Sequence, residues 1–329
     1  MVDITQVLDD LRAESADLDA LVAALPDSGW ATPTPAPGWT VAHQIAHLNW
    51  TDHAALVALT DPDRFAGIQR AAAADLTGLI ESGARDGVAL GPADLLARWR
   101  GGRDDLAAGL TGAGRVRVPW IGTTMSPASM ATARIMETWA HGQDVADALG
   151  VDRVPTGRLR HVAHLGVVTR DHAFGVRGRT PPAEPFRVEL TAPDGSAWTW
   201  GPDDRGPDVT GPALDFCLLV TRRRHRADLS LTATSGDADQ WLDPTWPRRS
   251  PGRRGRAARP AAQVDRRACP PAAPVHRRLA RPAGGCGPRS SPTRQTCRSW
   301  IDPEAADVTS RRVSRVLRPG RRADEVGNS

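Results

Sequence analysis

The sequence predicts an α+β protein, with a four-helix bundle followed by a small α/β domain. In the first half of the chain, apolar residues recur at intervals of three and four, as amphipathic helices require. Between Phe186 and Trp200 they alternate with polar residues, as a half-buried hairpin does. Neither period continues beyond residue 243. We therefore predict domains at 1–152 and 153–243, followed by a disordered Arg/Pro-rich tail at 244–329.

The bundle is predicted from long segments whose ends carry helix start and stop signals. Thr40 suits a helix start, Pro127 a first helical turn and Gly150 a C-terminal cap. The first predicted helix covers 4–25, the second 40–59 and the last 126–149. The third element of the bundle is supplied by two segments, 63–82 and 92–110, with a Gly-containing turn between them. Such segments with moderate loops are typical of a helical bundle.

The second domain is predicted from a change of period. A helix follows Pro155 and runs to about Phe174. The alternating residues then form a hairpin around a Pro-Asp-Gly turn. A helix over 212–221 and a strand at 229–232 complete the small α/β domain.

The charge of the chain divides at the same place as its periodicity. Residues 244–329 hold 20 arginines against 6 acidic residues, whereas residues 1–243 hold 22 against 32. The sequence pI of 9.4 therefore comes from the tail. A shifted reading frame would explain this Arg, Pro and Gly mixture. The competing interpretation is a basic arm for nucleic acid, and the lack of an aromatic platform or repeated RGG-like unit argues against it.

Cysteine usage and hydropathy predict a cytoplasmic protein. Three of the four cysteines lie in the tail, so no disulfide framework is indicated. The first residues lack the pattern of a secretory signal, and no run approaches the roughly 20 apolar residues of a membrane helix. We expect no membrane partner.

Two segments carry candidate metal ligands. Glu137 and His141 are four residues apart on a predicted helix, which places them about 40° apart on one face. The predicted helix at 40–59 offers two candidates for a third ligand, His43 and His47. Two imidazoles and one carboxylate match a zinc site that keeps a fourth position open. On spacing alone, a buried polar pair or a solvated face is the favoured explanation of the pattern.

The context of these residues resembles a known family. Pro-Gly-Trp-Thr-Val-Ala-His-Gln-Ile-Ala-His-Leu at 37–48 and Glu-Thr-Trp-Ala-His-Gly-Gln-Asp at 137–144 resemble the two metal motifs of the mycothiol-dependent maleylpyruvate isomerase family, within the DinB-like superfamily. The resemblance implies a DinB-like bundle. It implies His47, Glu137 and His141 as ligands of a divalent metal, with Asp144 beside them, and leaves His43 outside the site.

The same resemblance implies a catalytic arginine near the end of the helix predicted at 212–221. Arg223, or a neighbour within 222–224, occupies this place. A guanidinium suits an anionic substrate because it offers a planar donor fork to a carboxylate. The alternative is a basic helix end stabilised by the helix dipole.

These features lead to one hypothesis and two alternatives. The leading hypothesis, which follows the resemblance, is a metal-dependent enzyme that holds zinc or another divalent metal and uses mycothiol as a low-molecular-weight thiol cofactor. It would act as an isomerase or an S-transferase on a small electrophilic or anionic substrate. The first alternative is a non-catalytic module that binds a metal or a small molecule. The second is nucleic-acid binding through the Arg-rich tail.

Overall fold

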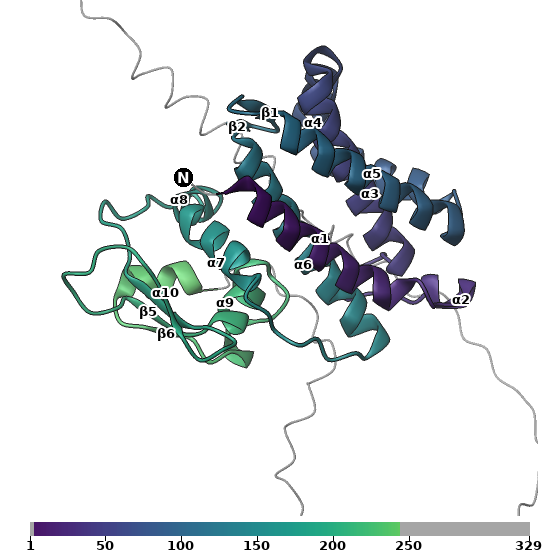
Figure 1. The fold of residues 1–329 in the computed structure, drawn as a ribbon. Helices are drawn as coiled ribbons and strands as arrows, with labels where there is room; N and C mark the ends of the chain where they lie inside the picture. Colours follow the sequence, from purple (N-terminus) through teal and green to yellow (C-terminus); the bar gives the residue numbers. More distant parts are fainter. Residues whose placement is uncertain (1–2, 244–329) are drawn as a thin grey trace, which may run out of the picture. The chain divides into compact units, whose positions relative to one another are not determined.

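The computed structural model describes residues 3–243 of the 329-residue chain. These residues lie within one compact unit and form a helical part followed by a mixed α/β part, which confirms the predicted α+β class (Figure 1). The division into two domains at 152 and 153 remains a prediction. The tail predicted at 244–329 lies outside the described residues, as do the disorder and frame-shift hypotheses about it.

Four long helices form the predicted bundle, and each packs against at least two of the others. They are α1 (Ile4–Val22), α3 (Val41–Thr60), α5 (Pro92–Gly112) and α6 (Pro127–Leu149). The short α2 (Asp27–Trp30) lies between the first two in sequence. The segment expected to supply the third element instead makes two helices, because α4 (Pro62–Val88) packs on α3 while only α5 joins the bundle. Gly91, with φ of +79°, separates them.

Helix α3 is enclosed on several sides, since α4, α5 and α6 all pack against it. Its apolar residues Val41, Ile45 and Leu48 are fully buried. Each such side chain contributes about 1.5–3 kcal/mol to stability when it leaves water. The polar side chains on its buried face, Gln44 and His47 among them, are therefore held in a desolvated setting.

A short hairpin precedes α6 in the chain. Strands β1 (Val118–Trp120) and β2 (Thr123–Met125) pair antiparallel, and Trp120 packs on Phe65 of α4. Gly122, with φ of +73°, makes the tight turn between them.

The α/β part is built on a four-stranded sheet of order β4-β3-β5-β6, in which β3 and β5 are parallel and the other pairs antiparallel. Its elements are α7 (Leu159–Val168), α8 (Arg170–Gly175), β3 (Val188–Thr191), β4 (Ala197–Trp200), β5 (Val209–Pro212), α9 (Ala213–Val220), the 3-10 turn η1 (Arg226–Asp228), β6 (Thr232–Ala233) and α10 (Gly236–Leu242). The predicted hairpin is β3–β4 and the predicted helix is α9. Thr169 breaks the expected helix into α7 and α8, and neither β5 nor α10 was predicted.

Helix α6 belongs to both cores. Met130 and Ile135 pack with the bundle, whereas Met136 and Trp139 pack with α7, α9 and the sheet. Because α6 is packed into both cores, its rotation about its own axis is fixed. The face that carries Glu137 and His141 is thereby held toward α3. Among residues 3–243, no helix is long and apolar enough to cross a membrane.

Candidate metal centre

Helix α3 begins with a cap in which His43 takes part. The backbone N–H of Thr40 donates to Nδ1 of His43 at 3.3 Å, and the Thr40 hydroxyl lies 2.9 Å from the same nitrogen. Such a capping box satisfies groups that the first helical turn leaves open. His43 therefore serves the start of the helix, and His47 follows one turn later.

Helix α6 brings the other two predicted ligands to one face. Ser126 caps its start by accepting the N–H of Ser129, and Gly150 ends it in the left-handed conformation. Between these caps the helix is regular, so Glu137 and His141 lie one turn apart. The sequence analysis predicted both ends of this helix.

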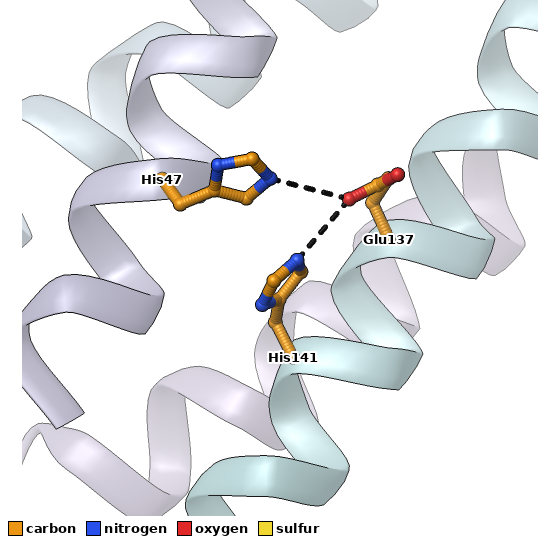
Figure 2. Close-up of side chains that lie close together, drawn as sticks. All are labelled: His47, Glu137 and His141. Carbon is orange, nitrogen blue, oxygen red and sulfur yellow. Dashed lines mark hydrogen bonds and ion pairs between the residues drawn. The ribbon is translucent and has the colours of Figure 1, made fainter. Parts of the chain in front are cut away.

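The three predicted ligands meet between α3 and α6 (Figure 2). Glu137 Oε2 lies 3.4 Å from Nε2 of His47 and 3.2 Å from Nε2 of His141. One ligand atom from each residue lies within 4.8 Å of the other two, and each residue is no more than 5% exposed. Within the described residues this is the group whose geometry suits a metal ion.

Burial and mutual contact shift the pKa values at the centre. Burial raises the pKa of Glu137, but the neighbouring imidazoles of His141 and His47 and the charge of Arg134 outweigh it, so the pKa lies well below its ordinary value. Burial, together with repulsion by His47, lowers the pKa of His141 to about 4. At neutral pH the centre therefore presents a carboxylate beside a neutral His141 imidazole, the protonation states that a metal selects.

Gln44 orients His141 from the opposite helix. Nδ1 of His141 donates to the Oε1 of Gln44 at 2.5 Å, and the Gln44 amide donates to Thr34 Oγ1 at 2.8 Å. An amide oxygen can only accept, so the single proton of neutral His141 stays on Nδ1 and its Nε2 lone pair faces Glu137. Gln44 was not among the site residues predicted from the sequence. It lies three residues before His47, about 60° away around the helix, and this spacing is the signal that could have indicated a residue near the centre.

Trp39 covers the imidazoles. Its ring centroid lies 5.5 Å from that of His47 and 6.1 Å from that of His141, and its indole N–H donates to Glu81 Oε1 at 3.1 Å. Trp39 is itself buried. Here the packed ring also forms an apolar wall of the candidate centre.

Comparison with known proteins identifies the family. Residues 11–146 match the family model described as the mycothiol maleylpyruvate isomerase N-terminal domain. Uncharacterized protein Rv0036c of Mycobacterium tuberculosis strain H37Rv is 57% identical over 244 residues, which cover 74% of this chain and 95% of that protein. Uncharacterized protein MT0041 of strain CDC 1551 matches with the same identity and coverage. The chain belongs to the mycothiol-dependent maleylpyruvate isomerase-like family.

Two further matches were found. A crystal structure of the mycothiol-dependent maleylpyruvate isomerase matches with a TM-score of 0.48 and 15% identity, covering 70% of this chain and 93% of that one. Residues 182–234, in the α/β part, match a family model described as wyosine base formation.

The remaining predicted site residues of this family member, Asp144 and Arg223, lie together behind His141. Arg223 Nη2 donates to Asp144 Oδ2 at 3.0 Å, its Nε to the carbonyl of Ala140 at 3.1 Å, and its Nη1 to the carbonyl of Thr221 at 2.6 Å. These bonds fasten the end of α9 to α6. The positive charge of Arg223 also contributes to lowering the pKa of His141. The catalytic role of Arg223 remains a prediction.

Proposed function

We propose that the chain is a cytoplasmic, divalent-metal-dependent enzyme that uses mycothiol, as an isomerase or an S-transferase acting on a small electrophilic or anionic molecule. The convergence of His47, Glu137 and His141 carries this proposal. Membership of the mycothiol-dependent maleylpyruvate isomerase-like family supports the thiol cofactor. Neither a nucleic acid nor a membrane is needed as a partner.

The donor set fits a metal ion. The Nε2 lone pair of neutral His141 and the Glu137 carboxylate oxygen are two acceptors 3.2 Å apart, a repulsive arrangement that a cation removes. Two nitrogens and one oxygen suit the borderline-soft zinc ion and leave a fourth coordination position open. A metal held there would supply a lowered thiol pKa, and hence a thiolate nucleophile at neutral pH.

The protein's own residues prepare this chemistry. Gln44 keeps the proton of His141 on the nitrogen that faces away from Glu137. Trp39 and the small residues of α3 keep bulk water from the imidazoles, which strengthens every charge interaction in the centre. Glu137 contributes the one negative charge of the donor set and so limits the net charge that a bound thiol experiences.

Turnover that needs both metal and thiol tests the proposal. Zinc-loaded protein should convert members of a panel of activated alkenes and other electrophiles only when mycothiol is present, as measured by product formation. His141→Ala should abolish turnover. His43→Ala, which alters a histidine outside the centre, should retain it. If the loaded protein binds mycothiol but converts no member of the panel, the non-catalytic binding module is the better account.

A further inference from the structure

Arg134 lies beside the candidate metal centre on the same face of α6. It precedes Glu137 by three residues and His141 by seven, so the three side chains lie within about 60° of one another around the helix. Arg134 is only 2% exposed, and its charge contributes to lowering the pKa of Glu137. The backbone positions of Arg134 and Glu137 are therefore about 4.5 Å apart along the helix axis, and a buried cation and a predicted metal ligand leave the same face of α6.

The hydrogen-bonding capacity of this cation is not used. Nε and Nη1 of Arg134 have no hydrogen-bond partner among the described residues. The carboxylate paired with it, Asp52, places Oδ1 3.8 Å from Nη1, which is too long for a hydrogen bond. Trp120 lies against the guanidinium at 5.5 Å and, by stacking on its face, leaves the donors at its edge free. A buried donor without a partner costs about 1–3 kcal/mol, and more when it is charged.

Arg134 and Arg223 differ in how many of their guanidinium nitrogens already have hydrogen-bond partners. Nε, Nη1 and Nη2 of Arg223 all donate to acceptors of this chain. An anion at Arg223 would have to share nitrogens that already donate to this chain, because only one further N–H remains on Nη1 and one on Nη2. Arg134 has two free donors and no such bonds to lose.

We propose that Arg134 binds a carboxylate of the molecule that occupies the metal centre, and that Arg134 rather than Arg223 selects anionic ligands there. The inference rests on the proposed function, because the other end of that molecule lies at His47, Glu137 and His141. A carboxylate oxygen can accept from the free Nε or from the free Nη1, and the positive charge of the guanidinium strengthens either hydrogen bond.

Asp52 is compatible with a second anion. It is almost fully buried, and burial raises its pKa to about 6. Its carboxylate therefore takes up a proton more readily than an exposed one when another negative charge arrives nearby.

A pair of matched thiols tests the inference without measuring turnover. The full-length protein, loaded with cobalt, is titrated with 3-mercaptopropionate and with its neutral analogue 3-mercaptopropan-1-ol, and the cobalt–sulfur absorption band gives each Kd. The wild type should bind the carboxylate thiol at least tenfold more tightly, since hydrogen bonds to charged groups contribute about 1.5–3 kcal/mol. Arg134→Met should remove this preference, and Arg223→Met should keep it.

The outcomes separate the inference from the proposed function. A band with both thiols whose Kd ratio is the same in wild type and Arg134→Met would overturn the inference alone. No band with either thiol would overturn the proposed function, and the inference with it. If Arg134→Met loses its thermal transition, Asp52→Asn replaces it as the test variant. Asp52→Asn keeps the Arg134 guanidinium and removes the carboxylate that competes for it, so the preference for 3-mercaptopropionate over 3-mercaptopropan-1-ol should rise. An unchanged preference would overturn the inference.

Discussion

Replacing Gln44 by Met should weaken metal binding without changing any ligand. Met has nearly the volume of Gln and keeps the packing of α3, but it removes the oxygen that accepts the His141 Nδ1–H at 2.5 Å. His141 is then free to rotate or to carry its proton on Nε2, where it cannot bind a metal. Loss of such a supporting hydrogen bond costs about 10- to 100-fold in metal affinity, or about 1.4–2.7 kcal/mol.

Competition with a chromophoric zinc chelator measures this loss. Thr34→Val is the matched control, because it removes the hydrogen bond that Thr34 Oγ1 accepts from the Gln44 amide and leaves the contact with His141 in place. Its affinity should fall less than that of Gln44→Met. Zinc affinity of Gln44→Met equal to that of the wild type would refute the assignment of Gln44 as the group that orients His141.

Three further predictions concern stability. Burial raises the pKa of Asp52 from 3.8 to about 6, so ionisation of this group costs stability as pH rises through that interval, in total about 3 kcal/mol. The unfolding free energy of metal-free Asp52→Asn, relative to wild type, should therefore increase between pH 4 and pH 8 in urea titrations, and a constant difference would contradict the cause given. Arg223→Met should lower the unfolding free energy by about 3 kcal/mol, because it leaves the buried carboxylate of Asp144 unpaired; a loss below 0.5 kcal/mol would show that the pair does not hold α9. A chain ending at Asp243 should unfold cooperatively at the full-length Tm, since the periodic pattern stops there, and loss of the transition would show that later residues support the fold.

The sequence predicted that Glu137 and His141 lie together because the relation between them is local. Glu137 and His141 share a helix whose start, at Ser126, and end, at Gly150, both carry recognisable caps. Four-residue spacing on such a helix determines that two side chains lie one turn apart. The choice of His47 over His43 was not local. It came from the family resemblance, and the structure adds a physical reason, since His43 takes part in the cap of α3.

The supporting residues could not be predicted because they act across the fold. Gln44 reaches His141 from another helix, and its spacing from His47 places it near the same face of α3 without showing that it contacts His141. In the sequence, Arg134 cannot be distinguished from other arginines on amphipathic helices. Only the structure shows that it is buried and that Nε and Nη1 have no hydrogen-bond partner among the described residues. The sequence also could not show that α4 lies outside the bundle. Apolar residues have helical spacing in both α4 and α5, so only tertiary packing determines which of the two joins the bundle.

Metal content tests the central claim, that His47, Glu137 and His141 form one metal site. Elemental analysis of the purified protein after dialysis against zinc should find about one ion per chain in the wild type, because three ligands leave one open position on a single ion. His47→Ala and His141→Ala should lose the ion, while His43→Ala should keep it. Wild-type zinc content in both His47→Ala and His141→Ala would contradict the account.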